Sequence, residues 1–324
     1  LRQRPPDQVL ADPYGRPVAG EISGLDSLLP ADAAPTYPLA ITFADFARLK
    51  GYDLPATNVR PGAILPLTLY WESLAWTPQN YNVFIQLVSA NGVTLERKHT
   101  SPVKRSFPTS RWRPGDLVPD YYTFTVPPGI LPGKYRFDLG LYSKMTGIRL
   151  PAVGPDGSTD DHVSLGIFIV PDPALDLQAI THRAEFSAGE PPLIRLLGYD
   201  LESQTVAPGK ALNLMLYWQA LRLMDQDFTV FVHLLDADGH IQAQQDMQPM
   251  EGRAPTSWWF PGEVFRDPHP VALSATIAPG NYILAVGLYH WPTLERLPLF
   301  DSAGQRLPED RALFPPSITV KPNS

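Results

Sequence analysis

Apolar and polar side chains alternate along several short segments of this chain. Over residues 65–71 and 212–218 every second position is a leucine or, at the end, a tryptophan. The same spacing recurs in four further segments, residues 81–87, 135–141, 228–234 and 282–288. A period of two is typical of a β-strand with one buried face, and no segment shows sustained helical periodicity. We therefore predict an all-β protein.

Turn residues separate these segments. Asn91-Gly92 and Asp238-Gly239 each follow an alternating segment, and both pairs are typical of the tip of a β-hairpin. The 37 prolines are scattered between the apolar runs, which favours many short strands with stiff connections. About seven or eight such strands in roughly 120 to 150 residues indicate an antiparallel β-sandwich. Immunoglobulin-like and jelly-roll topologies both remain open.

The sequence repeats itself at a constant offset of 147 residues. Gly51–Leu54 recurs at Gly198–Leu201, and the Leu-Tyr-Trp that ends at Trp71 recurs at Trp218. Between Gly51 and Pro151, 38 of 101 aligned positions are identical without a gap. We interpret this as an internal duplication that produced two tandem sandwich domains.

Three segments follow from the repeat. Residues 1–37 have no counterpart and are interpreted as an N-terminal arm or linker, residues 38–171 as copy one, and residues 172–324 as copy two. The junction Pro171-Asp172-Pro173 is too rich in proline to continue a strand ladder.

Composition limits the classes of partner and cofactor. The formal net charge of −7 argues against nucleic-acid binding, and the absence of cysteine excludes disulfides and thiol chemistry. No apolar run has the length of a membrane span, so we expect contact with a membrane only through a segment outside this sequence.

The sequence carries no recognisable catalytic motif. No histidine is kept in both copies, and the pair His233 and His240 across the second hairpin is a weak basis for a metal site. Three acidic positions do recur: Asp53 with Asp200, Asp116 with Glu263, and Asp120 with Asp267. Since each lies beside a Gly or Pro turn, we expect these carboxylates to cap backbone N–H groups. We predict neither an enzyme, nor a cofactor, nor a metal.

The tryptophans divide into two groups. Trp71 and Trp218 are in phase with the buried face of their strands, and we expect them in the two cores. Trp258 and Trp291 stand where copy one has Arg111 and Lys144, so the shared fold does not require an aromatic ring there. With His290 and Glu263 nearby in sequence, these two rings form our candidate ligand-binding site, suited to stacking on a sugar.

The repeated pattern also resembles a known family. Tyr217-Trp218, the segment Phe228–Asp236, Pro255-Thr256-Ser257 with Trp259–Glu263, Pro279–Tyr282 and Gly287-Leu288-Tyr289 are together similar to the extracytoplasmic C-terminal β-sandwich repeats of bacterial membrane mannosyltransferase-like glycosyltransferases. The resemblance covers residues 38–320 and assigns no functional residue. It implies a cell-surface or secreted location and an accessory role beside glycan transfer.

Two functions remain open at this point. The first is a non-catalytic module that binds a surface glycan or an acceptor protein. The alternative is a structural surface protein (a spacer, layer or filament subunit) that self-assembles through its sheet edges and its N-terminal arm.

Overall fold

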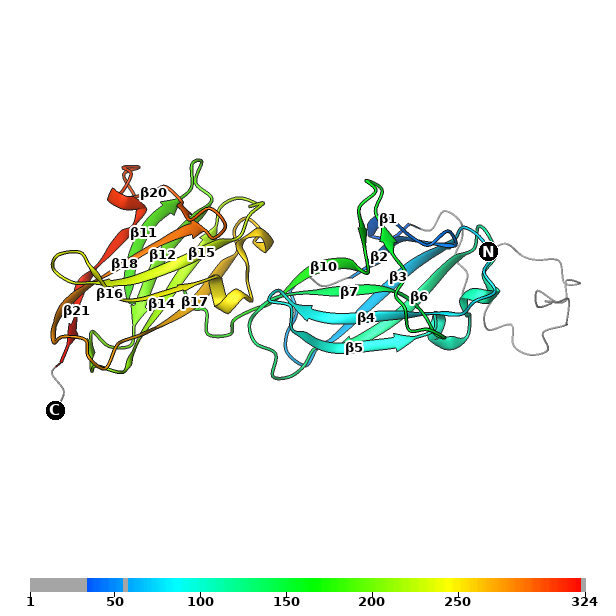
Figure 1. The fold of residues 1–324 in the computed structure, drawn as a ribbon, viewed down its shortest axis with the longest axis horizontal. Helices are drawn as coiled ribbons and strands as arrows, with labels where there is room; N and C mark the ends of the chain where they lie inside the picture. Colours follow the sequence, from blue (N-terminus) through cyan, green and yellow to red (C-terminus); the bar gives the residue numbers. More distant parts are fainter. Residues whose placement is uncertain (1–33, 55–57, 322–324) are drawn as a thin grey trace, which may run out of the picture. The chain divides into compact units, whose positions relative to one another are not determined.

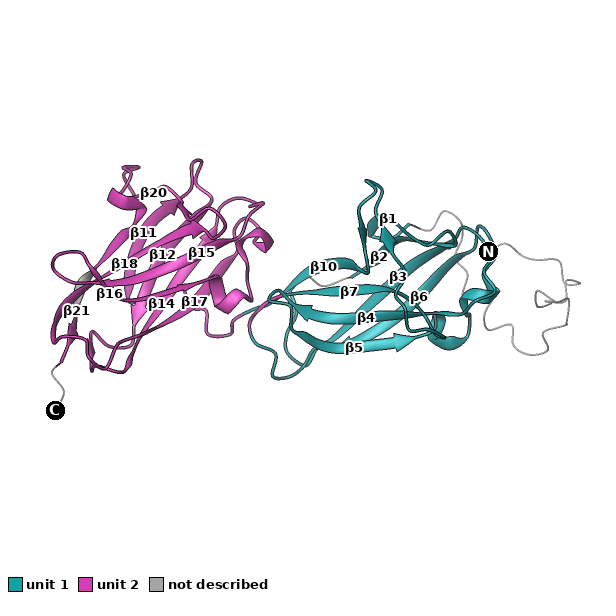
Figure 2. Ribbon diagram, in the orientation of Figure 1, with its two compact units in different colours: residues 1–131, 135–171 teal, residues 132–134, 172–324 magenta. Residues whose placement is uncertain are grey.

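The computed structural model describes residues 34–54 and 58–321, and within them all regular structure is β-strand apart from five short 3₁₀ turns. The all-β prediction is therefore confirmed. Most of the predicted N-terminal arm, residues 1–33, lies outside the described residues. No helix in the described part of the chain has the length and apolar character needed to cross a membrane. The chain divides into two compact units: unit 1 comprises residues 1–131 and 135–171, and unit 2 comprises residues 132–134 and 172–324 (Figures 1 and 2).

Unit 1 contains two antiparallel sheets. One has the strand order β6-β3-β2-β1-β8-β9 and the other β10-β7-β4-β5. The strands are β1 (Tyr37–Phe43), β2 (Ala47–Asp53), β3 (Ile64–Ser73), β4 (Tyr81–Ser89), β5 (Thr94–Thr100), β6 (Leu117–Thr125), β7 (Gly133–Ser143), β8 (Ala152–Val153), β9 (Thr159–Asp160) and β10 (Val163–Val170). The 3₁₀ turns η2 (Val103–Arg105) and η3 (Thr109–Arg111) lie between β5 and β6.

The two sheets of unit 1 enclose one apolar core. Trp71 on β3 and Trp112 after η3 are both fully buried, as the strand phase predicts for Trp71. Phe124 of β6 and Phe137 of β7 belong to different sheets, and their ring centroids are 4.7 Å apart. Rings that touch across the space between two sheets make this unit a β-sandwich.

Unit 2 also contains two sheets, with the strand orders β17-β14-β12-β11-β20 and β13-β21-β18-β15-β16; β19 pairs with β18. Its strands are β11 (His182–Ala188), β12 (Ile194–Leu201), β13 (Thr205–Val206), β14 (Ala211–Ala220), β15 (Phe228–Leu235), β16 (Ile241–Met247), β17 (Val264–Ala272), β18 (Gly280–His290), β19 (Glu295–Arg296), β20 (Leu299–Phe300) and β21 (Ala312–Val320). Its 3₁₀ turns are η4 (Pro249–Gly252), η5 (Thr256–Trp258) and η6 (Pro308–Asp310).

Residues that match in sequence occupy matching positions in the two units. Trp71 pairs with Val118 across β3 and β6, and Trp218 pairs with Phe265 across β14 and β17. Both pairs obey the offset of 147 residues. The common strand register fits an internal duplication, which remains an inference from the sequence.

Both predicted hairpins are present. Gly92 lies in the turn between β4 and β5, and Gly239 lies in the turn between β15 and β16. Their φ angles are +85° and +83°, the left-handed region that favours glycine. The hairpin prediction is confirmed at both sites.

Gly287-Leu288-Tyr289 repeats Gly140-Leu141-Tyr142 of unit 1, and the glycine of this motif has a packing cause. Phe231 of β15 lies against Gly287 of β18, and a Cβ atom at position 287 would come within 2.4 Å of the Phe231 ring. The Arg296 guanidinium covers the same ring at 4.6 Å. In unit 1, Gly140, Phe84 and Arg149 make the same arrangement, since Arg149 lies 4.1 Å from the Phe84 ring. The glycine of the motif is thus required by its neighbouring strand.

Candidate functional site

A row of four side chains crosses the outer face of the five-stranded sheet of unit 2. Backbone pairing places Phe300 of β20 opposite Ser187 of β11, Ser187 opposite Arg195 of β12, and Arg195 opposite Gln219 of β14. The flanking residues Ile194, Leu196, Trp218 and Ala220 are buried in the core. Because side chains alternate along a strand, Arg195 and Gln219 must point to the opposite, outer face.

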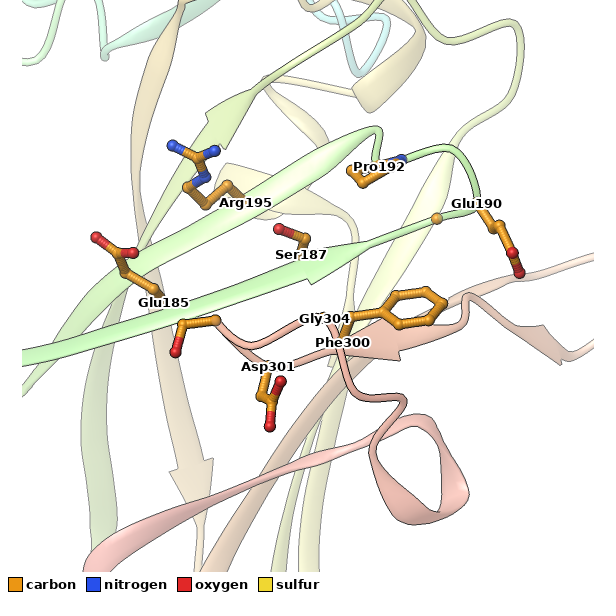
Figure 3. A pocket seen from close by; sticks show the side chains of 10 residues that line it. Glu185, Ser187, Glu190, Pro192, Arg195, Phe300, Asp301 and Gly304 are labelled. Carbon is orange, nitrogen blue, oxygen red and sulfur yellow. The ribbon is translucent and has the colours of Figure 1, made fainter.

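Two loops turn one end of this row into a groove. The β11–β12 connection contributes Glu190 and Pro192, and the turn after β20 contributes Asp301 and Gly304. With Glu185, Ser187, Arg195 and Phe300 these residues line a hollow of about 450 Å³, which we call the Arg195 groove. Figure 3 shows Ser187 in the middle of the lining, between Arg195 on one side and Phe300 and Asp301 on the other.

The polar groups of the Arg195 groove are available to a ligand. Among the described residues the Arg195 guanidinium has no ion pair or hydrogen bond, and neither has the exposed Glu185 carboxylate. Asp301 is partly used, since its Oδ1 accepts hydrogen bonds from the backbone N–H groups of Ala303 and Gln305 at 2.9 and 2.8 Å. The groove thus offers one fork of N–H donors, carboxylate acceptors and one aromatic ring.

The matching row of unit 1 differs at two decisive positions. It reads Val153, Thr42, Arg48 and Glu72 across β8, β1, β2 and β3. Arg48 donates from Nη1 to the Glu72 carboxylate at 3.1 Å, so its charge is already neutralised within the chain. Unit 2 has the uncharged Gln219 in place of Glu72, and it has the Phe300 ring in place of Val153.

The candidate residues predicted from the sequence lie elsewhere in unit 2. Trp258 ends η5, and the backbone N–H of Phe228 donates to Thr256 Oγ1 of the same turn at 2.9 Å. Phe228 also pairs with His290, so η5 and the end of β18 border the same end of the sandwich. Trp291 is 64% exposed and Trp258 is half-buried.

These predicted residues have separate contacts, and the Glu263 carboxylate accepts from the Lys134 ammonium at 2.7 and 2.6 Å. The Trp291 ring lies 6.2 Å from that of Tyr289, and His290 Nδ1 lies 3.2 Å from Thr293 Oγ1. Glu263 accepts a hydrogen bond from the Phe260 N–H at 2.7 Å. Within the described residues, Trp291, His290 and Glu263 make no bond or ring contact with one another. The Arg195 groove has the more complete set of ligand groups.

In two of the three recurring carboxylate pairs, the carboxylates accept hydrogen bonds from backbone N–H groups near turns and at the beginnings of strands. Asp116 accepts from the Arg113 N–H at 2.8 Å, as Glu263 does from Phe260. Asp200 accepts from Thr181 N–H and the Tyr217 hydroxyl. Burial acts to raise the pKa of Asp200, but these hydrogen bonds outweigh it and lower that pKa. Asp53 repeats the arrangement with Thr36 and Tyr70.

The third pair also binds backbone N–H groups, but not those of the adjacent turn as the sequence predicted. Asp120 and Asp267 lie inside strands β6 and β17 and are completely buried. Asp267 accepts from the Met250 N–H at 2.7 Å and from the Trp218 indole at 3.1 Å, and it lies 2.8 Å from His269 Nε2. Met250 has a φ of +54°. The buried carboxylate therefore fixes a left-handed turn that begins 17 residues earlier in the chain.

Asp120 has the same role in unit 1. It accepts from the Val103 N–H at 2.8 Å and from the Tyr122 hydroxyl at 2.5 Å. Burial raises the pKa of Asp120 to about 6, against the lowering effect of these two bonds. The Trp71 indole is close enough to lower that pKa further, although its N–H makes no bond of hydrogen-bonding geometry.

Two exposed turns bring three metal-ligating side chains together: Asp160, Asp161 and His162, and Asp236, Asp238 and His240. Three of their four carboxylates, those of Asp160, Asp161 and Asp236, accept hydrogen bonds within the chain. Asp236 accepts from the N–H groups of Asp238 and His240, and Asp161 accepts from Arg149. His233, which the sequence places near His240, instead lies 3.7 Å from Asp246. Among the described residues, His233 and His240 make no contact with each other, and His162 lies 2.8 Å from Asp161.

Sequence reasoning missed the Arg195 groove, because its residues come from β11, β12 and β20, and β20 lies beside β11 only through strand pairing. The available signal was the contrast between the copies, Gln219 against Glu72 and Phe300 against Val153. A comparison with protein-family models and with curated protein sequences finds no match for this chain.

Proposed function

We propose that this chain is a non-catalytic glycan-binding module that acts outside the cytoplasmic membrane, as an accessory of a cell-surface or membrane glycosyltransferase system. The single observation that carries the proposal is the unpaired Arg195 on an open sheet face beside Ser187 and Phe300. A sugar presents hydroxyl groups at its edge and C–H groups on its face. A guanidinium fork, a hydroxyl and an aromatic ring match that combination.

The non-catalytic part of the proposal rests on how the carboxylates are used. A glycosidase needs one carboxylic acid whose pKa is raised by a desolvated site, and a second carboxylate across the sugar bond. In the Arg195 groove, Glu185 and Glu190 are exposed to solvent, and Asp301 is bonded to its own turn. The recurring carboxylates outside the groove hold backbone N–H groups of the chain itself.

The location and the accessory role are supported by the sequence resemblance over residues 38–320. A sheet face that holds a glycan would keep acceptor or product close to a membrane enzyme. In this proposal the enzyme's chemistry belongs to another segment or another protein.

Glycan titration of the full chain by calorimetry tests this function. Arg195→Ala is expected to weaken binding at least tenfold, since the fork of donors is lost. Arg48→Ala is the matched control, because Arg48 occupies the same row of unit 1 and is already tied to Glu72. Absence of binding across a broad glycan panel would refute the proposal, as would equal effects of the two variants. Release of sugar from any probe would refute its non-catalytic part.

An assembly role has one observation in its favour. Edge strand β5 of unit 1 presents Glu96, Arg97 and Lys98, charges of the kind that prevent pairing between sheet edges. The matching edge strand β16 has Ala243, Gln244 and Gln245 at these positions, and its Ile241 is 46% exposed. If β16 joins copies of the chain, Gln244→Lys should abolish oligomers that light scattering detects in the wild type.

A further inference from the structure

The charges of the Arg195 groove restrict the ligand it accepts. Three carboxylates, those of Glu185, Glu190 and Asp301, line the hollow with a single guanidinium. The local charge is therefore negative, although an arginine is part of the lining. An anionic ligand would gain the contact with Arg195 but would be repelled by the surrounding carboxylates. A neutral polyhydroxyl ligand can donate to the carboxylates and accept from the guanidinium without that repulsion.

Gln219 decides whether Arg195 is free to act. Gln219 and Arg195 are paired residues on neighbouring strands, as Glu72 and Arg48 are in unit 1. In unit 1 the carboxylate of Glu72 accepts a hydrogen bond from Arg48 Nη1 at 3.1 Å, which occupies the guanidinium. The Gln219 side chain is uncharged and makes no hydrogen bond to Arg195. At this position the two rows differ by a single functional group, an amide instead of a carboxylate.

We propose that the Arg195 groove binds a neutral pyranose-containing glycan and that Gln219 is the residue that allows the groove to bind it. This inference rests on the proposed glycan-binding function and adds the ligand class and the specificity-determining residue. Arg195 donates to two neighbouring hydroxyl groups of the sugar, Glu185 accepts from a third, and the Phe300 ring stacks on the C–H face. Gln219 contributes by leaving the donors of Arg195 unoccupied.

The length of the row sets the size of the ligand. Phe300 and Gln219 are separated by three steps between neighbouring strands, which is about 14 Å at the usual strand spacing. Such a span accommodates two linked sugar rings. We therefore expect a disaccharide or longer neutral oligosaccharide to bind more tightly than its monosaccharide.

The test is a calorimetric titration of the full chain with neutral oligosaccharides of mannose, glucose and galactose, and with uronate-containing oligosaccharides of equal length. Neutral probes are expected to bind and uronate probes to bind at least tenfold more weakly. Gln219→Glu should lower the affinity for the neutral probe at least tenfold, because the new carboxylate captures Arg195. Its melting temperature should stay within a few degrees of the wild type, since the change is on the outer face.

Two further variants separate capture of Arg195 from other effects. Gln219→Ala removes the amide without adding a charge, and it should reduce the affinity by no more than about threefold. Glu72→Gln, the reverse change in unit 1, should leave the affinity of the chain unchanged because Val153 offers no ring for stacking.

The outcomes distinguish this inference from the function on which it rests. Preference for the uronate probes would overturn the ligand class while leaving glycan binding intact. A Gln219→Glu variant that binds like the wild type, while Arg195→Ala does not bind, would overturn the role of Gln219. Failure of every glycan to bind would refute the proposed function itself.

Discussion

The buried tryptophans of the two cores are the residues whose role is most directly open to measurement. Trp218 is 1% exposed and donates its indole N–H to the buried Asp267. Trp218→Ala should lower the free energy of unfolding of unit 2 by about 3 to 5 kcal/mol, from the lost burial of the ring, the cavity it leaves and the loss of one hydrogen bond to Asp267. Chemical denaturation followed by fluorescence measures this. Trp291→Ala is the control at an exposed site, expected within about 0.5 kcal/mol of the wild type; a similar loss in both variants would contradict the assignment.

The buried carboxylate of Asp120 makes the stability of unit 1 depend on pH. Its pKa is about 6 in the folded chain against an ordinary value of 3.8, so the folded state binds more protons between these values. Stability should therefore fall as the pH rises from about 4 to 6 and remain lower above 6, by about 3 kcal/mol in all. Asp120→Asn keeps an acceptor for the Val103 N–H but cannot ionise, so its stability relative to the wild type should rise over this range.

Urea unfolding of both proteins between pH 4 and pH 8 gives that comparison. Tyr122→Phe removes a bond that lowers the Asp120 pKa and should move the step to higher pH. A difference between the wild type and Asp120→Asn that does not vary with pH would show that Asp120 is already ionised throughout.

The sequence predicted which strand residues face the core, but it did not predict hydrogen-bond partners that are distant along the chain. Period-two spacing identified Trp71 and Trp218 as core residues because it is a local property of the strand. Asp120 and Asp267 were assigned to the adjacent turns because each has a proline beside it. Their actual partners, the N–H groups of Val103 and Met250, are 17 residues away and come close only after the 3₁₀ turn folds against the strand.

At the scale of elements, the hairpin tips test the backbone directly. Gly239 has a φ of +83°, and a Cβ atom at this position would meet nothing within 4 Å. Gly239→Val should therefore destabilise unit 2 by about 1 to 2 kcal/mol through backbone strain alone. Thermal unfolding measures the effect. Gly239→Asn should restore much of the loss, since asparagine tolerates this region, and equal losses for valine and asparagine would point to a cause other than φ.

The central strands were easier to predict than the sheet margins. Residues 65–71, 81–87 and 135–141 fall within β3, β4 and β7, whose inner faces are continuously apolar. Strands β8 and β20 have two residues each and carry no periodic signal. Because Phe300 belongs to β20, the ring of the Arg195 groove could be placed only by the pairing of that short strand with β11.

At the scale of the whole molecule, each unit has its own enclosed core, and the lining of the Arg195 groove falls within residues 185–304 of unit 2. We expect residues 172–324, produced alone, to fold cooperatively and to bind the neutral glycan within about threefold of the full chain. Circular dichroism and calorimetry check both points. A folded fragment without affinity would show that residues outside it complete the site.

The contrast between Glu72 and Gln219 also bears on how such a protein changes over generations. Glutamate and glutamine codons differ in their first base alone, so one point mutation in the gene interconverts the two states of the arginine on the outer row. Neither state disturbs the core, because the side chains concerned face outward from their strands. A chain with two similar units can therefore gain or silence a sugar site in one of them while the other is left untouched. Natural variation at codons 72 and 219 should then indicate which of the two units is under selection to bind a sugar.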